Sequence, residues 1–234
     1  MGKEIPEKRH GLHIALVPDG NRRWAKKRGK PVLAGHKAGA KKMEELAKWC
    51  AERDDVDMVT IYALSTENLN RDKKELSHLW DVYEQGLKRF VKRNKDENGL
   101  RLNITGDAGV WKKDFKTAAK DVMKATQHYT GGVLNVMLAY GSQFEILNSV
   151  KKIAAKGLKT MPAVEKAFRS CLMVSNPVDL VIRTGNEHRL SNFLLYQAAY
   201  AEIHFSKSMW PDFSKKEFEK ILKWYYKRDR RMGK

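Results

Sequence analysis

The chain has 234 residues and a formal net charge of +18, because 46 Lys and Arg stand against 28 Asp and Glu. Its 42% of hydrophobic residues is typical of a globular protein and excludes an intrinsically disordered chain. No apolar run approaches the ~20 residues of a membrane-spanning helix, and no signal peptide opens the sequence. We therefore expect a cytoplasmic protein, peripheral at a membrane at most. The surplus positive charge predicts a polyanionic partner, which is nucleic acid, an anionic membrane surface or a phosphorylated substrate.

Six short runs rich in Val, Ile and Leu predict β-strands. They are residues 13–17, 58–64, 100–105, 134–139, 179–183 and 202–206. Near-continuous apolar runs of this kind are typical of parallel strands that are covered on both faces. Helical patterns lie between the runs, which predicts crossover connections and an α/β fold.

The helical patterns are amphipathic segments between and after these strands. They begin near Gly35 and then cover residues 72–94, 114–128, 142–155, a segment opening at Met161, 188–201 and 215–228. No repeat or linker divides the chain. The sequence therefore predicts a single domain over residues 1–234, with a central, mostly parallel six-stranded sheet flanked by helices.

The segment 72–94 carries an unusually long apolar stripe. Its members are Leu76, Leu79, Trp80, Tyr83, Leu87, Phe90 and Val91. Core packing is the default explanation for such a stripe. A helix of this character can also wall a hydrophobic tunnel, and the pattern alone does not separate the two.

Polar residues follow the predicted strands at the edge where open α/β sheets bind ligands. Three of these loops combine arginine with small, amide or hydroxyl residues: Asp19-Gly20-Asn21-Arg22-Arg23, Ser65-Thr66-Glu67-Asn68-Leu69-Asn70-Arg71 and Arg183-Thr184-Gly185-Asn186-Glu187-His188-Arg189-Leu190-Ser191-Asn192. Arginine forks suit phosphate oxygens, and glycine lets the backbone approach a ligand. Three such loops at one edge predict a site for more than one phosphate group.

Two carboxylates are candidates for one Mg2+ site. Asp19 stands among cations and is either their partner or a metal ligand, while Glu202 opens an apolar strand, where an unpaired carboxylate is costly. Hard oxygen ligands together with substrate phosphates suit Mg2+. His36, in the first turn of a predicted helix, is either close to a bound anion or simply buried.

Six stretches match the motifs of a known family in order. They are Asp19-Gly20-Asn21-x-Arg23-Trp24, Gly35-His36-Lys37-x-Gly39, Ser65-x-Glu67-Asn68-x-Asn70-Arg71, Asp179-Leu180-Val181-Ile182-Arg183-Thr184-Gly185, Glu187-His188-Arg189-x-Ser191-Asn192-Phe193 and Trp210-Pro211-Asp212-Phe213. The sequence resembles the cis-prenyltransferases, and undecaprenyl diphosphate synthase is the nearest type. The matches run from near residue 13 to residue 233, which is nearly the whole chain.

The resemblance implies an enzyme that uses Mg2+ to condense isopentenyl diphosphate onto an allylic prenyl diphosphate, such as farnesyl or geranylgeranyl diphosphate. The implied product is a long (Z)-polyprenyl diphosphate, and diphosphate is released. The resemblance further implies a homodimer and a hydrophobic tunnel for the product, and no nucleic acid as partner.

The resemblance also implies roles for individual residues. Asp19 and Glu202 would hold the metal, Asn68 would lie where the proton is lost, and His36 would lie near the allylic diphosphate. The implied substrate-binding residues are Gly20, Asn21, Arg22, Arg23, Trp24, His36, Ser65, Thr66, Glu67, Arg71, Arg183, Arg189, Leu190, Ser191, Arg231 and Gly233. Of these, Arg183, Arg189 and Ser191 would grip isopentenyl diphosphate, and Arg231 and Gly233 would reach toward the partner subunit's site.

Four positions depart from the bacterial pattern. Leu69 replaces a usual Trp, Arg22 stands where Gly is frequent, Val32 stands where an arginine often contacts the diphosphate, and Asn186 replaces a second Gly. These changes keep open a variant that makes short chains or prenylates another acceptor. A non-catalytic partner subunit or a basic nucleic-acid-binding protein is less favoured, because such a protein need not retain the implied site residues together.

Overall fold

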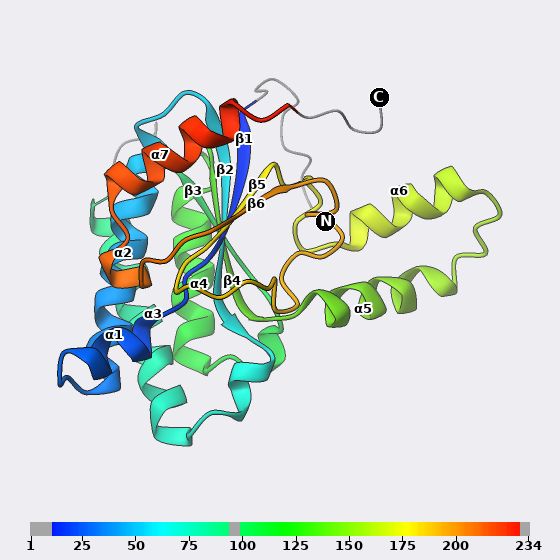
Figure 1. Cartoon of the computed structure of the whole chain (residues 1–234). Helices are drawn as coiled ribbons and strands as arrows, with labels where there is room; N and C mark the ends of the chain where they lie inside the picture. The colour runs from blue at the N-terminus through cyan, green and yellow to red at the C-terminus, as the bar shows by residue number, and fades with distance from the viewer. Residues whose placement is uncertain (1–10, 94–98, 230–234) are drawn as a thin grey trace.

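The structure, a computed structural model, describes residues 11–93 and 99–229 and is built around one six-stranded sheet (Figure 1). The strands are β1 (Leu12–Val17), β2 (Val56–Ser65), β3 (Arg101–Thr105), β4 (Val133–Tyr140), β5 (Leu180–Arg183) and β6 (Glu202–Phe205). Their order is β3-β4-β2-β1-β5-β6, and each neighbouring pair is parallel. All six predicted strands are confirmed. Every residue of β1 and β4 is buried, as the continuous apolar runs predicted.

The described residues form seven α-helices around the sheet. They are α1 (Asn21–Lys27), α2 (Val32–Ala51), α3 (Lys73–Arg93), α4 (Lys113–Thr126), α5 (Ser142–Ala154), α6 (Met161–Cys171) and α7 (Lys215–Tyr226). Apolar side chains of α2, α3, α4 and α7 form one core with one face of the strands. The fold is therefore a single α/β domain, as predicted.

The other face of the sheet is covered largely by chain without helical structure, and the predicted helix over 188–201 is wrong. Ser191, Asn192 and Leu194 have φ of 51°, 64° and 45°. These left-handed conformations cannot belong to a right-handed helix. The apolar pattern that predicted a helix arises because this irregular segment is itself part of the core: Phe193 and Leu194 are fully buried against the strands.

Helix α1 was not predicted, because it lacks an apolar stripe: Ala25 is its only buried residue. The following helix, expected near Gly35, begins at Val32. The two helices touch at glycines of α2. A Cβ at Gly35 would lie 2.1 Å from the Asn21 carbonyl oxygen, and one at Gly39 would lie 2.3 Å from Asn21 Oδ1. This close contact fixes the residues that follow β1.

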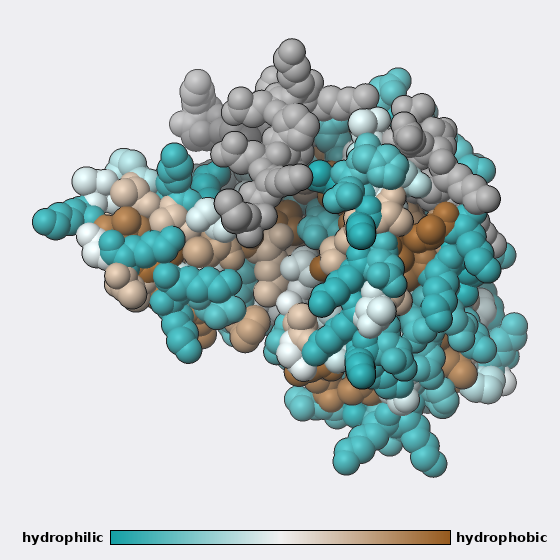
Figure 2. All heavy atoms as spheres, turned by 180° about the vertical axis from the view of Figure 1, so that it is seen from behind, coloured by the Kyte–Doolittle hydropathy of each residue, from teal (hydrophilic) through white to brown (hydrophobic). Residues whose placement is uncertain are grey.

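Helices α5 and α6 form an arm that projects from the body of the molecule (Figure 1). Apolar side chains are exposed along it, namely Phe144, Leu147, Val150 and Met161. Seen from behind, hydrophobic surface lies among hydrophilic residues on the projecting part (Figure 2). Within the described residues, none of the helices has the length and hydropathy needed to cross a bilayer.

Candidate active site at the carboxyl ends of the strands

A cavity of about 760 Å³ opens at the carboxyl ends of β1, β2 and β5. It brings together twelve of the predicted site residues: Asp19, Gly20, Asn21, Arg22, Arg23, His36, Ser65, Glu67, Asn68, Arg71, Arg183 and Ser191. These residues come from all three strand-end loops and from the first turns of α1 and α2. Parallel strands place their carboxyl ends at one edge of the sheet, which is why loops far apart in sequence meet here.

Arg183 is the most firmly held cation of the cavity. Its side chain is 4% exposed, and a buried guanidinium requires partners. Nη2 donates to Asp19 Oδ2 at 2.9 Å, and Nη1 donates to Ser191 Oγ at 2.7 Å and to the Arg189 carbonyl oxygen at 2.6 Å. Its Nε is buried and has no hydrogen-bond partner among the described residues.

Asp19 lies between two guanidinium groups. Arg23 Nη2 approaches Asp19 Oδ1 at 3.3 Å, and Arg23 Nη1 lies 3.4 Å from Glu187 Oε1. The Asp19 backbone is fixed as well, because its N–H donates to Thr184 Oγ1 and its carbonyl accepts from the Trp210 N–H, both at 2.9 Å. The carboxylate is thus held at the point where β1 and β5 end.

Glu75 gathers a second cluster at the other side of the cavity. Its Oε1 lies 3.1 Å from His36 Nε2, 3.6 Å from Arg71 Nη1 and 3.8 Å from Arg22 Nε. Burial lowers the pKa of His36, although the hydrogen bond with Glu75 opposes the shift, so the imidazole is neutral at pH 7. Glu75 was not among the predicted site residues, although its spacing of four residues from Arg71 is typical of an ion pair on one face of a helix.

Hydrogen bonds tie the loop after β2 to the segment after β5. Asn192 Nδ2 donates to Glu67 Oε1 at 3.1 Å, and the Asn68 N–H donates to Ser65 Oγ at 3.2 Å. Burial acts to raise the pKa of Glu67, but hydrogen bonds to its carboxylate, including those from Ser65 and Asn192, outweigh burial and lower it. Glu67 is therefore ionised at neutral pH.

Tyr62 also lines the cavity. It was not predicted as a site residue, because the pattern of an aromatic residue inside a strand indicates core packing. Its hydroxyl donates to the Tyr140 carbonyl at 3.0 Å and the Ser191 carbonyl at 3.3 Å. Burial raises its pKa. The phenol thus stays neutral and joins the ends of β2 and β4 to the segment after β5.

Four predicted residues lie around the cavity rather than in its wall: Trp24, Thr66, Arg189 and Leu190. Trp24 Nε1 donates to Asp212 Oδ1 at 2.7 Å, and the Arg28 guanidinium lies 4.4 Å from the centre of its ring. Arg189 is paired with Glu187 at 2.6 Å. The predicted residues Arg231 and Gly233 lie outside the described residues.

A metal site shared by Asp19 and Glu202 within one chain is wrong. Glu202 pairs with Leu180 at the amino-terminal end of β5, whereas Asp19 lies beyond the carboxyl end of β1. Because parallel strands keep these ends on opposite edges of the sheet, the two carboxylates cannot share an ion. Glu202 is instead paired with Arg228 Nε at 3.2 Å.

Asp19 alone fits a Mg2+ ion that is bound together with substrate. The described residues contain no group of three or more His, Cys, Asp or Glu side chains placed to hold a metal. Mg2+ is commonly held by one or two carboxylates plus substrate phosphates and water. The Asp19 Oδ1 atom, only loosely engaged by Arg23 at 3.3 Å, is the suitable ligand.

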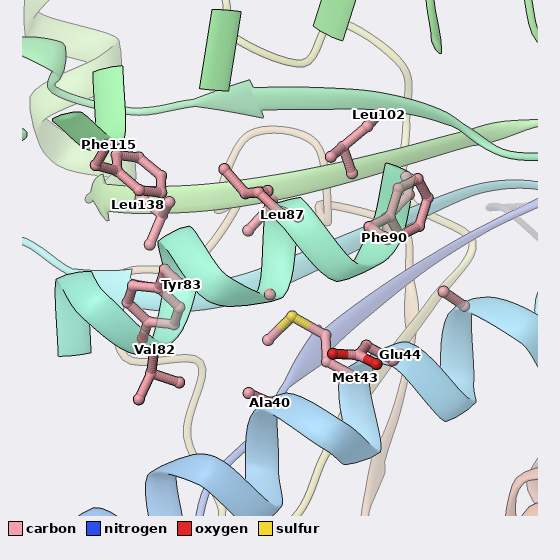
Figure 3. Close-up of a pocket in the computed structure, with 14 residues that line it drawn as sticks. Ala40, Met43, Glu44, Val82, Tyr83, Leu87, Phe90, Leu102, Phe115 and Leu138 are labelled. Carbon is pink, nitrogen blue, oxygen red and sulfur yellow. The ribbon is translucent and has the colours of Figure 1, made fainter. Parts of the chain in front are cut away.

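A second, apolar cavity lies between α2, α3 and the sheet (Figure 3). Its volume is about 60 Å³, and its wall includes Met43, Leu87, Phe90 and Leu138. Tyr83 lines both cavities, so the apolar cavity adjoins the polar one. The stripe of α3 therefore serves core and cavity together, while a continuous tunnel stays a prediction.

Comparison with known proteins decides the family. The family model described as "Putative undecaprenyl diphosphate synthase" matches residues 17–233. The chain belongs to this cis-prenyltransferase family. The enzyme is therefore a transferase of prenyl diphosphate synthesis, as the motifs predicted.

Curated relatives and a solved structure support this cis-prenyltransferase assignment. The chain is 42% identical over 228 residues to tritrans,polycis-undecaprenyl-diphosphate synthase (geranylgeranyl-diphosphate specific) of Pyrococcus abyssi, covering 94% of this chain and 86% of the relative. It is 39% identical over 231 residues to ditrans,polycis-undecaprenyl-diphosphate synthase ((2E,6E)-farnesyl-diphosphate specific) of Salmonella paratyphi A, covering 96% and 91%. The crystal structure of lavandulyl diphosphate synthase from Lavandula x intermedia in complex with dimethylallyl diphosphate superposes with a TM-score of 0.89 at 31% identity, covering 95% and 98%.

Proposed function

We propose that this enzyme elongates an allylic prenyl diphosphate with isopentenyl diphosphate in a Mg2+-dependent reaction, forming cis double bonds and releasing diphosphate. The observation that carries the proposal is the 760 Å³ cavity, which Arg22, Arg23, Arg71 and Arg183 line together with Asp19. Two diphosphates in one cavity require this density of cationic donors. Holding them side by side aligns the reacting carbons and removes much of the entropic barrier.

The allylic diphosphate is assigned to the loop between β1 and α1. Gly20 has a φ of 106°, and a Cβ there would lie 3.0 Å from Met209, so the backbone can adopt this turn only with glycine. Asn21, Arg22 and Arg23 then present their donors beside Asp19. The neutral imidazole of His36 has a single N–H, which Nε2 gives to Glu75 at 3.1 Å, so His36 holds Glu75 beside this loop.

Isopentenyl diphosphate is assigned to Arg183, Arg189 and Ser191. Arg183 lines the cavity, and its Nη2 carries a second N–H besides the one given to Asp19. In the reaction the allylic C–O bond breaks with its electron pair going to diphosphate, and the isopentenyl double bond attacks the allylic carbon. A proton is then lost from the isopentenyl unit near Asn68.

The arginines stabilise the negative charge that develops on the leaving diphosphate. Mg2+ held by Asp19 and diphosphate oxygens would neutralise the same charge. Because Arg183 and Arg23 both contact Asp19, the carboxylate also sets the positions of the two guanidinium groups relative to one another.

The growing hydrocarbon is assigned to the apolar cavity behind Tyr83. At about 60 Å³ this cavity is far smaller than a long prenyl chain, so we expect α2 and α3 to separate as the product lengthens. The starter is farnesyl or geranylgeranyl diphosphate, because the relatives named above carry one or the other specificity.

We further propose a homodimer that acts in the cytoplasm at a membrane surface. The exposed apolar residues of the α5–α6 arm supply a surface for a second copy. The net charge of +18 favours anionic headgroups, where a polyprenyl product would be released.

Incorporation of labelled isopentenyl diphosphate tests this function. Purified protein is incubated with geranylgeranyl or farnesyl diphosphate and Mg2+, with and without EDTA. We expect butanol-extractable label only when the allylic diphosphate and the metal are both present. Label that enters lipid without an allylic starter, or equally in EDTA, would contradict the proposal.

The similarity to lavandulyl diphosphate synthase favours one second candidate, a family variant that stops after few additions or uses another acceptor. Leu69, which packs against the core beside the cavity, and Asn186, in the turn after β5, are the departures that motivate it. Products of one or two additions, or label in a non-isopentenyl acceptor, would establish this variant.

A further inference from the structure

The carboxylate of Glu217 lies behind the proposed isopentenyl diphosphate site and is not part of the cavity wall. Glu217 stands in the first turn of α7, and its N–H donates to the hydroxyl of the N-cap residue Ser214 at 3.2 Å. In a capping box the glutamate side chain returns to the N–H of its own N-cap residue. Here both carboxylate oxygens accept hydrogen bonds from another segment: from Ser206 Oγ at 2.5 Å and from Ser208 Oγ at 2.7 Å.

The two serines hold the turn that follows β5. The Gly185 N–H donates to the Ser208 carbonyl at 2.7 Å, and the Asn186 N–H donates to the Ser206 carbonyl at 2.9 Å. Both turn residues have positive φ, 87° and 59°, a conformation that glycine adopts freely and asparagine tolerates better than most residues. The turn is held in place by these two hydrogen bonds, and they come from the segment that Glu217 fixes.

The Gly185–Asn186 turn sets the positions of Arg183 and Asp19. The Ser206 N–H donates to the Arg183 carbonyl at 2.7 Å, immediately before the turn. A Cβ at Gly185 would lie 2.8 Å from Arg23 Nη2 and 3.0 Å from the Asp19 carbonyl carbon, so there is no free space between the turn and the loop after β1. A displacement of the turn is thus passed directly to the groups that face the substrate.

We propose that Glu217 is a positioning residue for isopentenyl diphosphate binding. Its carboxylate holds Ser206 and Ser208, and their carbonyls hold the Gly185–Asn186 turn against Arg183 and Asp19. Hydrogen bonds to an ionised acceptor are stronger than those between neutral groups, which explains a carboxylate at this position. The inference rests on the proposed function for the identity of the ligand, whereas the link from Glu217 to the turn does not.

Steady-state kinetics of Glu217→Ala, Glu217→Gln and Ser208→Ala, with Glu219→Ala as matched control, test the proposal. Glu219 lies in the same helix and pairs with Arg53 at 2.9 Å, away from the serines. We expect Glu217→Ala to raise the KM for isopentenyl diphosphate about tenfold and to change the KM for the allylic diphosphate less than about twofold. Glu217→Gln should recover most of the loss, because an amide can still bond both hydroxyls, and Ser208→Ala should be intermediate.

Amide hydrogen exchange over residues 183–189 provides a readout that does not depend on turnover. Exchange at Gly185 and Asn186 should be faster in Glu217→Ala than in the wild type and unchanged in Glu219→Ala. Unchanged exchange, or faster exchange with an unchanged KM for isopentenyl diphosphate, would overturn the proposal. An equal rise in both KM values would also overturn it, since that indicates general damage.

The proposed function and the positioning role of Glu217 can be refuted independently. A wild type that incorporates no isopentenyl diphosphate would refute the proposed function and this choice of ligand, while hydrogen exchange would still decide whether Glu217 holds the turn. Should Glu217→Ala not fold, Glu217→Gln and Ser208→Ala carry the same comparison.

Discussion

Some side chains of the cavity make interactions that no neighbouring residue can make in their place. Asp19 is the clearest case, because one carboxylate contacts both Arg23 and Arg183 and is also the proposed metal ligand. Removing it would leave two guanidinium groups without their common partner and the metal without its ligand from the protein.

Asp19→Ala should lower kcat by several powers of ten, because both metal binding and arginine placement depend on this carboxylate. Circular dichroism should still show the folded protein, whereas the melting temperature should fall, because the buried Arg183 loses its carboxylate partner. Asp81→Ala, which removes an exposed carboxylate paired with Lys112, is the matched control. A loss of only a few-fold would remove Asp19 from the mechanism.

Arg183→Lys should raise the KM for isopentenyl diphosphate about tenfold or more. A lysine cannot span Asp19 and Ser191 at once, and it lacks the planar fork that binds phosphate oxygens in pairs. Kinetics with each substrate varied in turn are the measurement, and Arg169→Lys on α6 is the control. A selective defect for the allylic diphosphate would show that the two sites are assigned in reverse.

At the scale of elements, a row of buried polar side chains joins the strands. His13 on β1 bonds Thr60 on β2 at 2.7 Å, and Thr60 accepts from Asn135 on β4 at 3.0 Å. The other ring nitrogen of His13 lies 2.8 Å from the Pro177 carbonyl. Burial lowers the pKa of His13 to about 4, against the small opposing effects of the Pro177 carbonyl and Asp179.

This burial makes stability depend on pH in a defined direction. Between pH 6.5 and about 4 the unfolded imidazole takes up a proton while the folded one stays neutral, so the free energy of unfolding falls as the pH is lowered. The loss of unfolding free energy is on the order of 3 kcal/mol once the pH is below about 4, and it is absent above pH 6.5. Urea unfolding at several pH values should show a smaller pH dependence for His13→Gln than for the wild type. His78→Gln, at an exposed position on α3, should behave as the wild type; identical slopes for all three proteins would contradict this assignment.

Elements were predictable where burial and periodicity agree. Strands β1, β4 and β5 are buried along their whole length and produce continuous apolar runs, and the long stripe of α3 was equally clear. Helix α1 escaped because only Ala25 is buried, and residues 188–201 were misread because packing holds three residues with positive φ among apolar side chains. Sequence patterns report burial but not the hydrogen bonds that impose such conformations.

The site residues, too, were predictable where the sequence carries a local signal and were missed where it does not. The three strand-end loops were found because their arginines and glycine are unusual after apolar runs, and the sheet brings them together. Glu75 and Glu217 were missed, since their contacts with His36 and with Ser206 join segments that are distant or irregular in the sequence. Glu202 was misplaced because the strand register, not its apolar context, decides which edge of the sheet it occupies.

At the scale of the molecule, the projecting arm is the proposed dimer surface. Leu147 is 70% exposed at the centre of its apolar row. Leu147→Glu should convert the dimer to a monomer, because a charge would be buried in the interface without a partner. Sedimentation velocity measures this, with Lys124→Glu on α4 as the control. A dimer that survives the Leu147 change, or a wild type that is monomeric at micromolar concentration, would contradict the proposed surface.

The length of the prenyl product distinguishes a chain-elongating enzyme from a short-chain variant and from a protein without this activity. Wild-type protein is incubated with geranylgeranyl diphosphate, labelled isopentenyl diphosphate and Mg2+, and the products are dephosphorylated and sized by chromatography. We expect a series of prenyl alcohols, each longer by one isoprene unit, that ends at one long prenyl length, with cis geometry at each added unit. No incorporation by the folded protein in the presence of detergent would contradict it.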